Sequence, residues 1–145
     1  MTNSDAKYVA PFVLEYSYKR SLGPVLSRFM TSLRAKIIVG SRTKAGKVIV
    51  PPSEYDPETG EACEELIPVG PSGTVTSWCW VSAPTPEHPL DSAFAWALIQ
   101  LDGADTALVH AVAAAEDQMA TGIRVTPRWK NQCEGNIHDI VCFEV

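Results

Sequence analysis

The second half of the chain alternates between short apolar segments and turn signals, and this alternation limits the possible folds more than any other feature. Asp102-Gly103 and Glu134-Gly135-Asn136 have the composition of hairpin turns. Five segments have the apolar character of strands: residues 74–81, 94–101, 106–113, 123–130 and 137–143. Five strands with one polar break at residues 114–119 predict a mainly β protein built on a small closed barrel of the OB type.

One amphipathic helix is predicted at residues 21–36. Its apolar residues recur at the spacing of one continuous helical stripe: Leu22, Val25, Leu26, Phe29, Met30 and Leu33. Ser21 is a suitable N-cap, and Pro24 is tolerated because it falls in the first turn. The stripe must be buried, and in a small β protein the covering surface can belong to a second subunit.

The segment before this helix, residues 8–18, is rich in aromatic and apolar side chains and contains Pro11, so we expect an extended arm. Phe12 and Tyr16 are its candidate contact residues. The arm can pack against its own domain or against a partner, and both alternatives remain open. Residues 1–7 are expected to be a frayed tail.

Residues 37–65 change from basic to acidic. Two short strands, at 37–39 and 47–50, are predicted to flank a basic turn at 40–46, and Pro51-Pro52 ends the second strand. Residues 53–65 then carry six acidic side chains. Acids spaced this evenly favour a solvated loop over a carboxylate metal site.

The charge of the chain is unevenly distributed. Residues 1–50 hold nine Lys/Arg and two Asp/Glu, a net charge of +7, whereas residues 51–145 hold three and fifteen, a net charge of −12. The pI near 5.1 argues against general nucleic-acid binding, which requires a concentrated basic face. The basic third keeps a single phosphorylated ligand as a possible partner.

Composition also bears on location. The longest uncharged run, residues 66–86, contains four prolines and two glycines, so it is not predicted to span a membrane. The N-terminus lacks the basic-then-apolar pattern of a signal peptide, and we expect a cytoplasmic protein with reduced cysteines.

No nucleophile motif or phosphate-binding loop is found in the sequence. His88, His110 and His138 fall in separate segments, and strand histidines more often have structural than catalytic roles; His110 interrupts an apolar face. Trp78 and Trp80 share one face of a predicted strand. Core or interface roles are favoured for them over a stacking platform for bases.

Ordered short motifs over residues 12–145 resemble one known family. They read KVIVPP at 47–52, VGPSGTV at 69–75, AWALIQLDG at 95–103 and TGIRV at 121–125. The layout resembles the acyl-CoA-associated family that joins a rubredoxin-like zinc ribbon to an OB fold, known as domain of unknown function 35. The resemblance implies an arm and helix at 1–38, a ribbon at 39–68 and a barrel at 69–145.

The ribbon departs from the family pattern. Family members carry two Cys-x-x-Cys knuckles, but the matching positions here are Arg42, Ala45, Asp56 and Thr59. Structural zinc requires four thiolate or imidazole ligands, and Cys63 alone does not restore them. We therefore expect a metal-free knuckle.

Further phrases, DPETG at 56–60, FAWA at 94–97 and LDGAD at 101–105, are similar to subunits found with steroid-degrading aldolases. The resemblance implies a noncatalytic accessory subunit, without a cofactor, of a thiolase-fold aldolase. That lyase cleaves the side chain of steroid or bile-acid β-hydroxyacyl-CoA thioesters by a retro-aldol reaction. It implies a hetero-oligomer with two copies of this chain per partner dimer, and no binding to nucleic acid or membranes.

Two alternatives stay open: an accessory subunit of a hot-dog-fold enoyl-CoA hydratase, and a free OB-fold nucleic-acid-binding module. If the chain contacts CoA, we expect the contact at the basic turn, through Arg42, Lys44, Lys47, Pro51 and Pro52; otherwise these are solvated turn residues. Partner contact is expected at Phe12, Tyr16, Leu22, Leu26, Phe29, Trp78 and Trp80.

Overall fold

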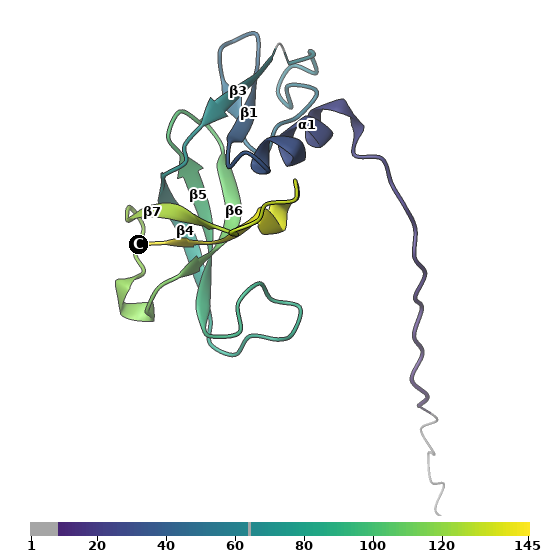
Figure 1. Cartoon of the computed structure of the whole chain (residues 1–145), viewed down its shortest axis with the longest axis vertical. Coiled ribbons are helices and arrows are strands. Elements are labelled where there is room, and N and C mark those ends of the chain that lie inside the picture. Colours follow the sequence, from purple (N-terminus) through teal and green to yellow (C-terminus); the bar gives the residue numbers. More distant parts are fainter. Residues whose placement is uncertain (1–8, 64) are drawn as a thin grey trace, which may run out of the picture.

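The computed structural model describes residues 9–63 and 65–145 (Figure 1). Tyr8 of the predicted arm, the predicted tail at 1–7 and Glu64 of the acidic loop lie outside the described residues. Within the described part, no helix combines the length and apolar character needed to cross a bilayer.

Five strands close a barrel in the order β4-β5-β6-β8-β7. The pairing of β6 with β8 is parallel, and the other four pairings are antiparallel. The strands are β4 (Gly73–Val81), β5 (Phe94–Leu101), β6 (Ala107–Ala113), β7 (Arg124–Trp129) and β8 (Ile140–Glu144). Pairing of β4 with β7, at Gly73 with Val125, closes the circle. The prediction of a mainly β fold with an OB-type barrel is confirmed. The last predicted strand begins later than expected, because residues Ile137–Asp139 form a short 3-10 helix, η2.

A smaller antiparallel sheet, ordered β2-β1-β3, precedes the barrel. It consists of β1 (Ile38–Arg42), β2 (Val48–Ile49) and β3 (Glu65–Val69). β3 was not predicted from the sequence. Its Pro68 weakens the strand pattern, but β3 lies at the edge of the sheet, where proline is tolerated.

Side chains from the β5–β6 turn attach this sheet to the barrel. The backbone N–H of Val48 donates to Asp105 Oδ2 at 2.7 Å, and that of Val50 donates to Thr106 Oγ1 at 2.7 Å. The Thr106 hydroxyl in turn donates to the Val50 carbonyl at 2.9 Å. The barrel thereby supplies hydrogen-bond partners for backbone groups of Val48 and Val50 that no strand of the small sheet pairs, as buried backbone groups require.

Helix α1 spans Gly23–Leu33, which is shorter at both ends than predicted. Leu22 occupies the N-cap without a side-chain cap, although the Ser21 hydroxyl accepts a hydrogen bond from the Gly23 N–H at 3.3 Å. At the other end, Lys36 has a φ of 59°, in the left-handed region that terminates helices.

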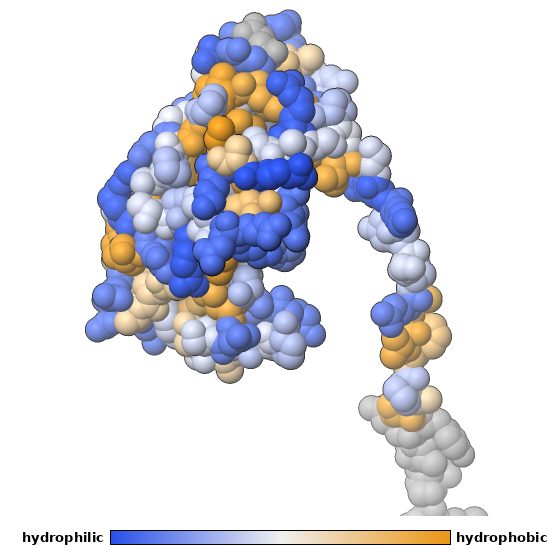
Figure 2. Space-filling view, in the orientation of Figure 1, coloured by the Kyte–Doolittle hydropathy of each residue, from blue (hydrophilic) through white to orange (hydrophobic). Residues whose placement is uncertain are grey.

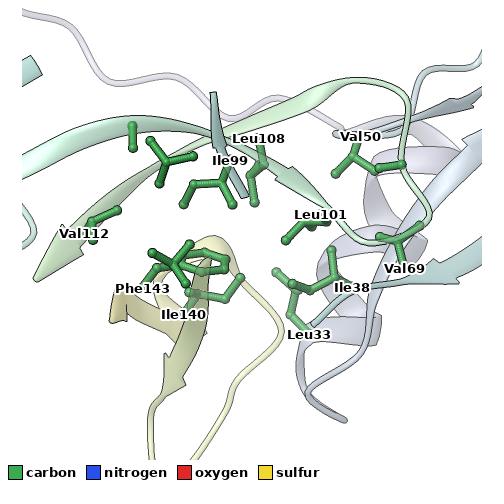
Figure 3. Close-up of a cluster of buried hydrophobic side chains, with 14 of the residues drawn as sticks. Leu33, Ile38, Val50, Val69, Ile99, Leu101, Leu108, Val112, Ile140 and Phe143 are labelled. Carbon is green, nitrogen blue, oxygen red and sulfur yellow. The ribbon is translucent and has the colours of Figure 1, made fainter. Parts of the chain in front are cut away.

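One hydrophobic core runs through helix, sheet and barrel (Figure 3). Leu33 of the helix, Ile38 and Val69 of the small sheet, and Leu101 and Phe143 of the barrel belong to the same cluster. The segments 1–38, 39–68 and 69–145 thus share a core where the structure describes them.

Phe29 corrects a prediction. We expected it to contact a partner, but it is only 1% exposed and lies in the chain's own core. The apolar stripe of α1 is divided: Phe29 and Leu33 are buried inward, Leu26 is half-buried, and Leu22 at the start is 46% exposed.

Trp78 and Trp80 are half-buried and pack against the main core. A register shift between Val75 and Ser77 in β4 places these even-numbered side chains on the same inward face as Val75. They therefore serve the core and do not form an open stacking platform.

The arm extends away from the body (Figure 1). Its large apolar side chains are 74–85% exposed: Val9, Phe12, Val13, Leu14, Tyr16 and Tyr18. Figure 2 shows apolar and polar groups following one another along it. Of the two alternatives for the arm, packing on its own domain is not what the structure shows.

Candidate functional site

The basic turn that we predicted to contact CoA faces the acidic loop of the same chain. Arg42 Nη1 lies 2.9 Å from Glu65 Oε1, and Lys44 Nζ lies 2.8 Å from Glu61 Oε1. Lys47 pairs with Glu58, and the hydrogen bond that Lys47 donates to that carboxylate, together with the carboxylate's charge, raises the pKa of Lys47. A phosphate at this turn would have to compete with these carboxylates.

The two prolines after this turn differ in accessibility. Pro51 is exposed, whereas Pro52 is buried, so the predicted contact of Pro52 with CoA is wrong for its side chain. Asp56 of the acidic loop is also buried and accepts a hydrogen bond from the Glu58 N–H at 2.8 Å. Among the described residues, no cluster of three or more His, Cys, Asp or Glu side chains is arranged to hold a metal ion.

The structure brings His88, His110 and His138, the three histidines of the sequence, to one pocket. It lies between the proline-rich loop at residues 82–93 and the segment that leads from β7 into β8. Figure 2 shows the body hollowed between these two segments. The pocket has a volume of about 620 Å³ and opens to solvent on one side.

Three parts of the barrel line this pocket. The β4–β5 loop contributes Pro86, Glu87, His88 and Pro89, and β5 and β6 contribute Trp96, Val109 and His110. The β7–β8 connection and β8 contribute Lys130, Ile137, His138, Ile140 and Val141. In OB folds, ligands usually bind on the face of the second and third barrel strands, beside the loops that join strand one to two and strand four to five. In this chain these are β5 and β6, the β4–β5 loop and the β7–β8 loop.

His110 is the most deeply buried of the three histidines, at 7% exposure. Its ring packs edge-on against Phe143, with centroids 5.4 Å apart, and its Nδ1 lies 3.4 Å from the Ala111 carbonyl oxygen. Burial lowers the pKa of His110 below its ordinary value of 6.5, and the nearby His138 lowers it further. The imidazole is therefore neutral at neutral pH.

Asp139 fixes the β7–β8 loop that forms one side of the pocket. Its buried carboxylate accepts hydrogen bonds from the N–H groups of Glu134, Gly135 and Asn136 at 2.9, 2.7 and 3.1 Å. Burial alone would raise the pKa of Asp139, but these three donors and the charge of Lys130 bring it below its ordinary value. No role was predicted for this residue from the sequence.

The convergence of the three histidines was missed because they belong to separate segments of the sequence. The only available signal was topological: once an OB barrel is assumed, the loop of His88 and the loop before His138 both border the face that carries His110. The remaining predicted residues are accounted for above: Phe12, Tyr16 and Leu22 are exposed, and Leu26, Trp78 and Trp80 are half-buried.

The barrel, its attached three-stranded sheet and the pocket on its ligand face define an OB-fold protein. Residues 66–130 match the family described as "ChsH2, C-terminal OB-fold domain". The family resemblance inferred from the sequence motifs is confirmed.

Two solved structures share the fold. The Ltp2-ChsH2(DUF35) aldolase matches with a TM-score of 0.62 at 20% identity, over 87% of this chain and 98% of that chain. A protein of unknown function from the DUF35 family of Sulfolobus solfataricus matches with a TM-score of 0.60 at 18% identity, over 73% and 77%. No curated protein sequence matches the chain.

Proposed function

We propose that this chain is a noncatalytic accessory subunit of a thiolase-fold aldolase. The complex would act in the cytoplasm on steroid or bile-acid β-hydroxyacyl-CoA thioesters and cleave the side chain by a retro-aldol reaction. The exposed arm carries the proposal, because six large apolar side chains at 74–85% exposure require a covering surface that the chain itself does not supply. The likeness to a structure titled as an aldolase with a ChsH2 subunit supports the choice of partner.

In this proposal the chemistry belongs to the partner. A general base of the aldolase takes the β-hydroxyl proton, the Cα–Cβ bond breaks, and the thioester enolate is stabilised by hydrogen bonds until it is protonated. Within the described part of this chain, the only side-chain hydrogen bond between a hydroxyl and a histidine is that of Thr85 with His88, and no carboxylate orients that imidazole. This arrangement supports a structural role.

The interface would combine the arm with the start of α1. Phe12 and Tyr16 are free to dock, Leu22 extends the apolar surface, and half-buried Leu26 lies one turn further along. Aromatic anchors of this kind carry most of the binding energy at protein interfaces. Two copies of the chain per partner dimer would follow from a two-fold symmetric partner.

Contact with CoA remains part of the proposal at the basic turn. Arg42, Lys44, Lys47 and exposed Pro51 border the acidic loop, and their ion pairs are solvent-exposed, so each contributes little to stability. A CoA phosphate could exchange with a carboxylate there at modest cost.

Co-purification tests the partner directly. The full chain, tagged at its C-terminus and expressed in its native host, should retain a thiolase-fold protein, and light scattering should give a mass equal to two copies of each subunit. Recovery of a hot-dog-fold hydratase would favour that alternative. Recovery of the chain alone, as a monodisperse monomer, would contradict the proposal.

A further inference from the structure

The proposed assembly makes no use of the three-histidine pocket, and the pocket has a distinct chemistry. Its volume of about 620 Å³ falls in the range of small-molecule sites. Trp96, Val109, Ile137, Ile140 and Val141 give it apolar walls. Such walls favour a ligand with a compact apolar body, because they lose no hydrogen bonds when water leaves them.

The loop side of the pocket is built before any ligand arrives. His88 Nδ1 accepts a hydrogen bond from the Thr85 N–H at 2.8 Å, which fixes the turn of the proline-rich loop. The His88 ring packs edge-on against buried Phe94, with centroids 5.5 Å apart, and 6.5 Å from the Trp96 ring. The loop therefore holds an aromatic wall in place. Because the loop is already ordered, ligand binding should cost little conformational entropy of the loop.

His110 supplies the polar group at the base of this apolar site. A carbonyl oxygen only accepts, so the Nδ1 contact with Ala111 makes Nδ1 the donor and leaves Nε2 of the neutral ring as an acceptor. Nε2 has no hydrogen-bond partner among the described residues. Every side-chain nitrogen or oxygen that is fully buried in the described part of the chain does have a partner, so Nε2 must keep some solvent-accessible surface. Nε2 is therefore accessible from the pocket that His110 lines.

Nε2 of His110 is a hydrogen-bond acceptor without a donor, so a ligand that satisfies it must carry a hydrogen-bond donor. The unprotonated nitrogen of a neutral imidazole repels carboxylate and carbonyl oxygens but accepts a hydrogen bond from a donor such as an O–H group. Lys130 and Glu87, which also line the pocket, carry opposite charges and give no net preference for an ion.

From this geometry we infer that the pocket binds an uncharged, largely apolar compound bearing a hydroxyl group, which donates a hydrogen bond to Nε2 of His110. The inference concerns the free chain and does not depend on the proposed aldolase partner.

A pair of matched probes tests the inference on the full chain. 5α-Androstan-3β-ol and 5α-androstan-3-one have the same ring system and differ in whether their single oxygen can donate. Titration should quench or shift the tryptophan fluorescence, to which Trp96 in the pocket contributes, and the alcohol should bind about tenfold more tightly or better, the size of effect that one unmet buried hydrogen bond produces. Equal affinities, tighter binding of the ketone, or no binding of either would overturn the inference.

Two substitutions at one position sharpen the test. His110→Leu should bind alcohol and ketone equally and more weakly, whereas His110→Gln, whose amide can accept from the alcohol or donate to the ketone, should bind both more tightly than His110→Leu without a preference for the alcohol. Thr126→Val, at an exposed position outside the pocket, is the control and should behave as wild type. Circular dichroism verifies folding, and the wild-type comparison of the two probes decides the question even if a variant fails to fold. Retention of the preference in folded His110→Leu would overturn the assignment to His110.

Discussion

Phe29 and Leu22 lie on the same apolar stripe of α1 but have opposite environments. Phe29 is 1% exposed and Leu22 is 46% exposed. Phe29→Ala should therefore lower the free energy of unfolding by about 3–5 kcal/mol, since it removes core contacts and leaves a cavity. Leu22→Ala should change it by less than about 0.5 kcal/mol. Urea denaturation followed by circular dichroism compares them, and similar losses would show that the helix does not pack through Phe29.

Asp139 makes the stability of the chain depend on pH. Its carboxylate is stabilised by three backbone donors, so its pKa is lower in the folded protein than in the unfolded chain. The resulting stability is complete above the unfolded value near 3.9 and is lost as the pH falls through the lower folded value. Asp139→Asn should be less stable than wild type at pH 7, and the difference should shrink below about pH 3.9. A difference independent of pH would contradict this role.

At the scale of elements, the contact between β2 and the β5–β6 turn depends on one hydroxyl. Thr106 both accepts from and donates to Val50. Thr106→Val keeps the shape but leaves the backbone groups of Val50 unpaired, and should cost about 1–3 kcal/mol. Hydrogen exchange at the Val50 amide should accelerate, whereas Thr126→Val, at an exposed position, should have no effect on it. Unchanged exchange in Thr106→Val would mean that the sheet is held by packing alone.

Most elements could be predicted because their patterns are local. The segment at 94–101 was placed exactly as β5 lies, and the barrel strands and α1 were located from apolar spacing and turn residues. β3 was missed because an edge strand carries a weak pattern, with proline and an acidic residue. The sequence also did not predict that the apolar stripe of α1 is buried at Phe29 and Leu33 but exposed at Leu22. The spacing of apolar residues shows that a helix face is apolar, but it does not show which surface covers that face.

At the scale of the whole molecule, the charge split seen in the sequence is partly neutralised within the fold. The basic turn pairs with the acidic loop, whereas Arg124 and Arg128 pair with Asp102 and Glu144 inside the acidic part of the chain. Residues distant in sequence make these contacts, so composition by segment overstated the electrostatic separation. The histidine pocket escaped prediction for the same reason: it exists only after the barrel closes.

The arm provides a test of assembly that leaves the body intact. Phe12→Ser combined with Tyr16→Ser should weaken association with the partner by tenfold or more, because exposed aromatic side chains are typical anchors. The melting temperature of the free chain should stay unchanged, since these side chains are 85% and 74% exposed. Unaltered affinity, measured by calorimetry, would remove the arm from the interface.

Activity measured with and without this chain tests the accessory-subunit proposal most directly. The thiolase-fold partner is expressed alone and together with the chain, and retro-aldol cleavage of a steroid β-hydroxyacyl-CoA is followed by release of the carbonyl product and the shortened acyl-CoA. The proposal predicts an insoluble or inactive partner alone and restored cleavage on co-expression. A monodisperse, fully active partner in the absence of this chain would contradict it.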